Sequence, residues 1–380
     1  MGRSAAARAL NAPYAVGFAR PGDDPDIRQL LRGTEFAGDV RLSLEREPHS
    51  LLAAAIEGDV RGTIVARDSA TGTLAGIASR AVRDVFINGK PARVGYLGQL
   101  RIATTFRRRR ELLEAGFAFC HMMHDRERDS SLYLASVVAD NHQARRLLAR
   151  QSAGWPRFEP VASVTSLAIP VSSGRRRPSD IVLYRGTPEA TDVIVDCLSR
   201  NGARWQFYPR WRAADFGSSR LLGLDPSDFV IATRAGHTVG CVACWDQRAF
   251  KQVIVRGYSP RLTRSRLFIN LISPFTGIPR LPREGTQLQF AYLSHFAIER
   301  DDDEDVVAAL VDGARERARE KGLDYVVVGL SRTCAALPAV ARAFKHRAYD
   351  SVLYVAFWPD AEAAARELDG RPPYPELAIL

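Results

Sequence analysis

The sequence lacks any long apolar run. No stretch of its 380 residues approaches the ~18 uninterrupted apolar residues of a membrane-spanning helix. Residues 1–14 carry charge without a sustained apolar core, so we expect a flexible tail rather than a signal peptide. The five cysteines are scattered and odd in number, which argues against a disulfide framework and favours a reducing cytosol. We therefore expect a cytoplasmic protein.

The sequence also offers little for a metal site. Cys241 and Cys244 form a lone C-x-x-C in an apolar, strand-like run, and no second Cys or His pair stands at a suitable spacing. His121 and His124 lie three residues apart on an expected helix, and the pattern supplies no third ligand. We interpret all four as packed residues and expect no metal.

Charge is unbalanced, because 53 Lys and Arg residues outnumber 43 Asp and Glu residues and give a formal net charge of +10. An excess of positive charge is typical of proteins that bind an anionic cofactor, an acidic partner protein or nucleic acid. The positive charge gathers at Arg107–Arg110, Arg145–Arg146 and Arg175–Arg177, and the negative charge at Asp301–Asp305. The positions of these charges, more than the net charge, indicate which of these partners to expect.

The most informative stretch begins at Tyr96. A strand-like run ends at Ile102, four consecutive arginines follow at Arg107–Arg110, and a helical pattern starts at Glu111. A helix start carries unpaired backbone N–H groups and the positive end of the helix dipole, and guanidinium groups fork onto phosphate oxygens. The segment predicts a site for a phosphorylated cofactor, with a solvated charged face or a nucleic-acid patch as the alternatives.

The two halves of the chain repeat one order of strands and helices. The run Tyr96–Ile102 matches Tyr292–Ile298, and each is followed by a charged loop, a helix, an apolar strand, a helix and a strand. Residues 171–180 are rich in Ser, Gly, Arg and Pro and are expected to form a linker. We predict a mixed α/β fold with one unit at 15–170 and a second at 181–380.

This order resembles the GNAT superfamily of acyl-CoA-dependent N-acyltransferases. The family's pyrophosphate-binding turn, Q/R-x-x-G-x-G/A, falls on Arg107–Leu112, where Arg110 and Leu112 replace the glycine and the Gly/Ala. The family's Asn-x-x-Ala-x-x-Leu-Tyr matches at Asn141, Ala144 and Leu147, with Leu148 in place of the tyrosine. The resemblance implies two GNAT-like domains in tandem, each a mixed, mostly antiparallel sheet flanked by helices.

The resemblance also implies where an acyl-CoA would lie. The backbone of Leu100, Arg101 and Ile102 would contact the pantetheine arm, and the Ile102 N–H would stabilise the oxyanion. The phosphates and the rest of the cofactor would meet Arg107, Arg108, Arg109, Arg110, Glu111, Leu112 and Asn141. Gln99 and Tyr96 are the candidate catalytic residues on that strand, with Glu45, Glu47 and His295 as further candidates for proton transfer.

The second copy differs in charge at the corresponding turn. The loop after Ile298 carries six carboxylates from Glu299 to Asp305, and like charges would repel a pyrophosphate there. The same acids stabilise a helix start, which explains them structurally. We expect the first copy to bind the cofactor and the second to be a degenerate partner.

Two further segments leave alternatives open. Residues 204–212 carry aromatic and basic side chains that suit a substrate pocket, a base-stacking surface or, more often, a loop packed on a core. Residues 259–284 form a long irregular segment of the kind found in lids and substrate loops.

The function that the resemblance implies is an N-acyltransferase. It would move an acetyl or other acyl group from coenzyme A to a small-molecule or peptide amine, with acetyl-CoA or another acyl-CoA as cosubstrate. An acyl carrier protein or aminoacyl-tRNA donor, a non-catalytic module of the same fold, and a nucleic-acid-binding protein are the alternatives. No membrane partner is expected.

Overall fold

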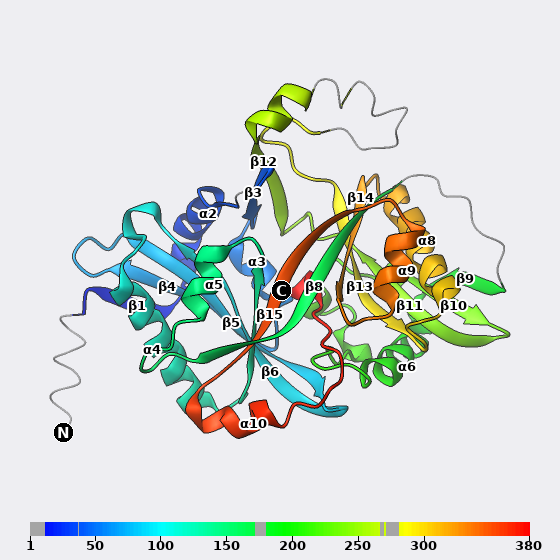
Figure 1. Cartoon of the computed structure of the whole chain (residues 1–380), viewed down its shortest axis with the longest axis horizontal. Helices are drawn as coiled ribbons and strands as arrows, with labels where there is room; N and C mark the ends of the chain where they lie inside the picture. The colour runs from blue at the N-terminus through cyan, green and yellow to red at the C-terminus, as the bar shows by residue number, and fades with distance from the viewer. Residues whose placement is uncertain (1–11, 37, 172–179, 267–269, 271–280) are drawn as a thin grey trace.

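One large sheet organises the molecule. The computed structural model describes residues 12–36, 38–171, 180–266, 270 and 281–380. Within these ranges twelve strands join in the order β1-β4-β5-β6-β7-β15-β8-β14-β13-β11-β10-β9, with helices packed against the sheet (Figure 1). Most of the expected tail, of the expected linker at 171–180 and of the central part of the 259–284 segment lies outside the described residues.

Most elements of the two halves follow the same order, although each half also contains elements without a counterpart in the other. The first half contains β1 Tyr14–Phe18, α2 Asp24–Arg32, β2 Glu35–Phe36, β3 Val40–Glu45, α3 Ser50–Ala54, β4 Val60–Asp68, β5 Leu74–Ile87, β6 Lys90–Ile102, α4 Arg110–Glu127, β7 Tyr133–Val138, α5 His142–Leu148 and β8 Arg157–Pro170. The second half contains β9 Ile181–Arg185, α6 Thr191–Gly202, β10 Phe229–Arg234, β11 His237–Trp245, β12 Gln252–Tyr258, β13 Phe290–Ile298, α8 Glu304–Glu320, β14 Tyr325–Ser331, α9 Ala336–Ala343, β15 Arg347–Phe357 and α10 Glu362–Arg366.

The pairing confirms a mixed, mostly antiparallel sheet with internal symmetry. Among the described strands, the pairs β6–β7 and β13–β14 are parallel, and the other pairs of this sheet are antiparallel. Each parallel pair follows the same path in its half: a strand, a covering helix (α4 or α8) and the next strand. The strand order is therefore nearly a mirror image about its centre.

The last strand of each half lies in the sheet of the other half. Strand β15 from the second half pairs with β7, whereas β8 from the first half pairs with β14. The two exchanged strands also pair with each other along most of their length, as the crossing ribbons in the middle of the molecule show (Figure 1). The two halves are thus joined through one continuous set of backbone hydrogen bonds, which the repeat in the sequence does not reveal.

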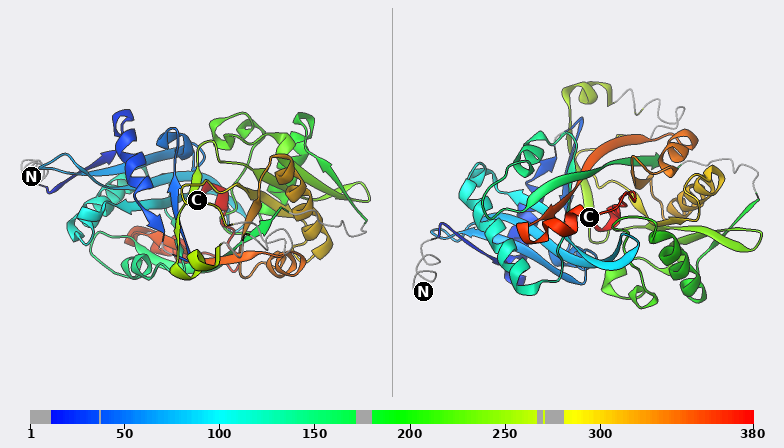
Figure 2. Two further views of the ribbon diagram at one scale, coloured as in Figure 1. Left: turned by 90° about the horizontal axis from the view of Figure 1, so that it is seen from above. Right: turned by 60° about the horizontal axis from the view of Figure 1, so that its bottom comes forward.

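A second, three-stranded sheet also joins the halves. It has the order β12-β3-β2 and stands beside the main sheet (Figures 1 and 2). Strands β2 and β3 were not among the expected elements, although Val40–Glu45 alternates apolar and polar residues as a strand does. The pairing of β12 with β3 places Ser43 and Glu45 of the first half beside a strand of the second half.

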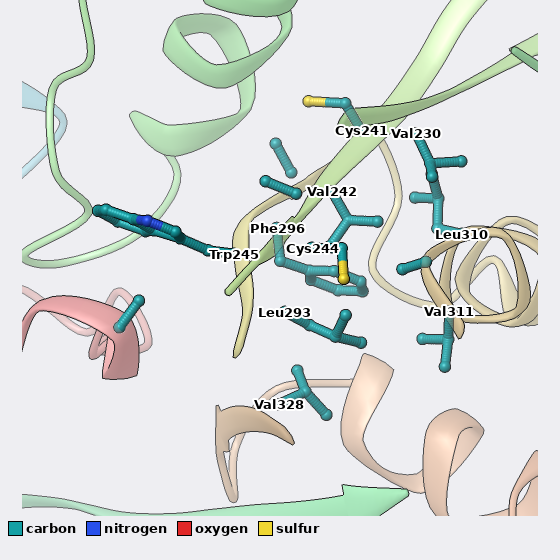
Figure 3. Close-up of a cluster of buried hydrophobic side chains, with 14 of the residues drawn as sticks. Val230, Cys241, Val242, Cys244, Trp245, Leu293, Phe296, Leu310, Val311 and Val328 are labelled. Atoms are coloured by element: carbon teal, nitrogen blue, oxygen red, sulfur yellow. The ribbon is translucent and has the colours of Figure 1, made fainter. Parts of the chain in front are cut away.

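The largest hydrophobic core lies in the second half. Valines, leucines and aromatic residues from β10, β11, β13 and β14 pack against α8, and Cys241 and Cys244 lie among them (Figure 3). All five cysteines of the chain are buried and unpaired with one another in disulfides. The packing explains the apolar C-x-x-C run as part of a core strand.

The aromatic residues of 204–212 also belong to this core. Trp205, Tyr208 and Trp211 are buried, and Phe207 and Tyr208 form backbone hydrogen bonds with Phe86 on β5. This segment therefore binds the second half to the first and does not present an aromatic surface. No helix of the described residues is long and apolar enough to cross a membrane.

Two glycines provide a test of the fold. A Cβ on Gly95 would overlap the ring of Tyr133, which is fully buried and cannot move away. We expect Gly95→Ala to lower the free energy of unfolding by about 1–3 kcal/mol through overpacking. Gly116, inside α4, has open space where a Cβ would stand, so Gly116→Ala should raise it by up to about 1 kcal/mol.

Urea denaturation of the two variants beside the parent protein measures both changes. Equal stabilities for Gly95→Ala and Gly116→Ala would show that the close contact of β6 with Tyr133 is wrong.

Candidate functional site

The candidate site lies where β6 and β7 part. The two strands pair only at Gly95 with Tyr133 and at Tyr96 with Leu134. From Leu97 to Ile102, the edge of β6 that faces β7 has no strand partner among the described residues. Backbone N–H groups on such an edge are available to a ligand.

A bulge in β6 redirects the backbone at this edge. Two residues, Gln99 and Leu100, stand opposite the single residue Ala78, and Gln99 has a φ of 55°. The amide of Ala103 donates to the carbonyl oxygen of Ala75 at 2.9 Å, so Gly76 and Ile102 form a non-hydrogen-bonded pair. The N–H of Ile102 therefore points away from β5, which is the orientation that its expected role requires.

The second copy contains the same bulge, with its amides already occupied. His295, at the position of Gln99, has a φ of 54°. Its N–H donates to the Glu376 carboxylate at 2.8 Å, and the N–H of Phe296 donates to the Tyr374 hydroxyl at 3.3 Å. Residues 374–380 therefore fill this place in the second half, whereas no described residue outside the sheet forms a hydrogen bond with the corresponding amides of Gln99 and Leu100.

The starts of α4 and α8 also differ, because only the start of α8 is occupied by a side chain of the described residues. Arg109 is the N-cap residue of α4, and no side chain caps this helix start; Arg107–Arg110 are all exposed. In the second half, the Asp303 carboxylate accepts from the N–H of Val306 at 3.2 Å and caps α8. The first helix start is thus open and cationic, whereas the second is closed by its own carboxylate.

Arginines neutralise much of the acidic loop before α8. Asp301 pairs with Arg204 at 2.8 Å, and Asp303 pairs with Arg234 at 2.6 Å. The hydrogen bond from Arg234 is the main cause that holds the pKa of Asp303 below its usual value. The acids therefore serve the structure of the second copy, in agreement with the interpretation of the loop as a helix cap.

The predicted catalytic residues lie together on β6, but their surroundings differ from the expectation. Burial raises the pKa of Tyr96 to about 12, so its hydroxyl keeps its proton at neutral pH. The side-chain amide of Gln99 donates to Glu57 at 2.9 Å, and Glu57 is buried and paired with Arg46. The Glu57 carboxylate therefore lies beside the bulge, and no sequence pattern indicated this position for it.

The remaining candidates have structural partners. Glu45 pairs with Arg256. Partial burial raises the pKa of Glu47, but the hydrogen bonds from Arg28 and Arg32 outweigh it and keep that pKa below its usual value.

Asn141 and the three histidines also have such partners. Asn141 caps α5 by accepting from the N–H of Ala144 at 3.0 Å. Burial lowers the pKa of His295 to about 3, so this ring is neutral, and it stacks on Trp211. His121 and His124 stack on Trp358, as packed residues do.

Four more charged residues meet near the junction of the halves. Arg83 donates to the carbonyl oxygen of Ile379 at 3.1 Å, and the Lys251 ammonium donates to that of Ala378 at 3.0 Å. Burial lowers the pKa of Lys251 to about 7, and nearby Arg46 adds to the effect. No local pattern marks Arg46, Glu57, Arg83 or Lys251, because contacts distant in sequence bring them together.

Comparison with solved structures identifies the fold. Over 90% of this chain, Sphaerobacter thermophilus GCN5-related N-acetyltransferase superposes with a TM-score of 0.52 at 14% identity, and 95% of that chain is covered. The chain has the GNAT fold. Saccharomyces cerevisiae N-myristoyltransferase with bound myristoyl-CoA matches 90% of this chain at a TM-score of 0.57 and 10% identity, with 82% of that chain covered.

A third GNAT structure belongs to a larger protein. It is the GCN5-related glucosamine N-acetyltransferase region in a fungal multi-domain GH3 β-N-acetylglucosaminidase, with a TM-score of 0.59 and 15% identity over 91% of this chain. This chain spans only 38% of that one. No family model and no curated protein sequence matches the chain. At these identities the comparisons establish the GNAT fold alone.

The carboxylate that fills the second copy predicts a pH effect on stability. Burial raises the pKa of Glu376 to about 7, well above the ~4.5 of an exposed glutamate. Its contribution to stability is therefore complete below about pH 4.5 and is lost as the pH rises through about 7. Between these pH values the ionisation of Glu376 should lower the free energy of unfolding by an amount on the order of 3 kcal/mol, and Glu376→Gln should abolish this decrease.

Thermal unfolding of both proteins from acid to neutral pH tests this effect. The difference in melting temperature between Glu376→Gln and the parent should shift in favour of the variant as the pH rises. A constant difference would show that Glu376 does not titrate in this range.

Proposed function

We propose that the protein is an N-acyltransferase that takes its acyl group from coenzyme A and uses the first GNAT copy. The observation that carries the proposal is the contrast between the two copies. The first leaves both its bulge amides and its helix start open, whereas the second fills the same two places with Glu376 and Asp303. A site that the protein does not satisfy itself is the one left for a ligand.

The open parts suit the two ends of an acyl-CoA. The start of α4 and the exposed arginines before it supply N–H donors and positive charge for a diphosphate. From there, the unpaired edge of β6 leads back to the bulge at Gln99. A pantetheine arm laid along this edge adds the pairing that β6 lacks and brings the thioester to the bulge.

The bulge then suits the chemistry of amide formation. An uncharged amine attacks the thioester carbonyl carbon, and the carbonyl oxygen gains negative charge. The C–S bond then breaks to release coenzyme A, and the proton that the nitrogen loses passes to the departing sulfur or to water. Amides that point away from β5, such as that of Ile102, can donate to the developing oxyanion. The occupied amides of His295 and Phe296 show, within the same molecule, that this backbone geometry binds oxygen atoms.

The arginines before α4 provide the test. We expect calorimetry to show binding of coenzyme A, and Arg108→Gln combined with Arg109→Gln to weaken it about fivefold or more and reduce its salt dependence. The matched control is Arg126→Gln with Arg150→Gln, which removes the same charge from two exposed positions elsewhere. The control should bind coenzyme A as the parent protein does.

The outcomes separate the proposed function from its alternatives. Absence of binding at millimolar coenzyme A would defeat the proposal, and turnover with an acylated carrier protein or an aminoacyl-tRNA instead would identify a different donor. Binding of coenzyme A without thioester turnover by any amine would favour a non-catalytic module, for which Leu148 in place of the family's tyrosine is the supporting feature.

A further inference from the structure

Arg101, two residues after the bulge, is a cation without a counterion. Its side chain is half-buried, and its guanidinium carbon lies 4.6 Å from the centre of the Phe36 ring. One nitrogen donates to the carbonyl oxygen of Leu100 at 3.0 Å. Every Asp and Glu of the chain lies in the described ranges, and none of these carboxylates comes within 4.0 Å of Arg101.

An unpaired guanidinium in this position is costly. Burial lowers the pKa of Arg101 to about 10, and repulsion from Arg46 contributes. A charge that is partly withdrawn from water normally finds a partner, and a guanidinium has five N–H donors to satisfy. Most of these donors have no acceptor among the described residues, so an anionic ligand group would be stabilised.

The neighbouring charges do not compensate Arg101. The Glu57 carboxylate is already engaged by Arg46 and Gln99. Arg83 is also buried. It donates to a backbone carbonyl oxygen and stacks on Tyr96, and it forms no ion pair within 4.0 Å with a carboxylate of the described residues. The region around the Tyr96 ring is therefore rich in positive charge, which favours an anion over a second cation.

The sheet separates Arg101 from the helix that would bind the diphosphate. Leu97 and Ile102 of β6 pack in the clusters that contain Cys120 and Leu112 of α4, so they face this helix. Tyr96 packs in a different cluster, on the opposite face, and Arg101 lies near Tyr96 and Phe36 on that face. Arg101 is thus unsuited to the phosphates beside α4 and faces the side from which an acceptor would reach the bulge.

We propose that Arg101 binds an oxyanion carried by the acceptor, so that the substrate is an amine that also bears a carboxylate or a phosphate. This inference rests on the proposed function and names its substrate class. The guanidinium fork pairs with the two oxygens of the anion, and the Phe36 ring supports the fork from one face. The anion then holds the amine of the same molecule near the thioester.

Binding of simple anions tests the site without any turnover. In thermal shift measurements, benzoate at millimolar concentration should raise the melting temperature of the parent protein, whereas the neutral benzamide should not. The rise should vanish in Arg101→Gln and persist in Arg126→Gln, which removes an exposed arginine of α4. Without ligand, Arg101→Gln should melt no lower than the parent protein, because it removes an uncompensated charge.

Turnover with paired amines identifies the anion. With acetyl-CoA, we expect kcat/KM to be about tenfold or more higher for tyrosine than for tyramine, or for phosphoethanolamine than for ethanolamine. Arg101→Gln should abolish that preference, so that kcat/KM for the charged member of each pair falls to about the value for its uncharged partner. The pair that shows the effect distinguishes a carboxylate from a phosphate.

Two results would overturn the inference. One is that benzoate does not stabilise the parent protein, or that it stabilises Arg101→Gln equally. The other is that Arg101→Gln lowers kcat/KM by the same factor for both members of each pair. If anion binding depends on Arg101 but no amine is acylated, the anion site stands and the proposed acyl transfer fails.

Discussion

The arrangement of this molecule depends on backbone amides that β6 and β13 turn away from their sheet neighbours. Each strand carries a bulge at the same place, and at each bulge the parallel neighbour has already departed. Buried or half-buried N–H groups require acceptors. The second half meets that requirement with residues 374–380, and the first half does not. Because of this difference, the first copy is the candidate ligand site, and the second copy is stabilised by its own residues.

Electrostatics reinforces the difference that the backbone creates. In the second half, acids cap the helix start and arginines from other elements neutralise them, so charge is balanced within the protein. In the first half, the arginines before α4 and the side chain of Arg101 remain largely without carboxylate partners, although Arg110 pairs with Glu114. Two unbalanced positive regions on opposite faces of β6 are consistent with two anionic groups, one at each end of a reaction between two substrates.

Local pattern accounted for much of this fold. The match of Tyr96–Ile102 with Tyr292–Ile298 correctly paired Gln99 with His295, the two bulge residues, because strand, turn and helix signals are written in neighbouring residues. The start of α4 and the cap of α8 followed from charge and helix-start rules for the same reason. The roles of the site residues on β6 remain predictions that await measurement.

The features that the sequence did not reveal depend on contacts between distant residues. Strand β15 pairs with β7, and β12 pairs with β3. The residue pattern of each segment can indicate a strand, but it does not indicate which strand is its partner. Glu57 lies beside Gln99, and Glu376 beside His295, because the sheet brings them together. Arg101 was expected to contribute its backbone; its missing counterion became visible only when the position of every carboxylate was known.

The exchange of β8 and β15 also has a consequence for biogenesis. A ribosome releases β7 long before it has made β15, so the edge of β7 stays unpaired while the whole second half is synthesised. Throughout that interval the nascent chain exposes a strand edge that can capture β8 in a local, non-native pairing. Synthesis of β15, and not the emergence of the first repeat, is then the event that allows either repeat to reach its final architecture.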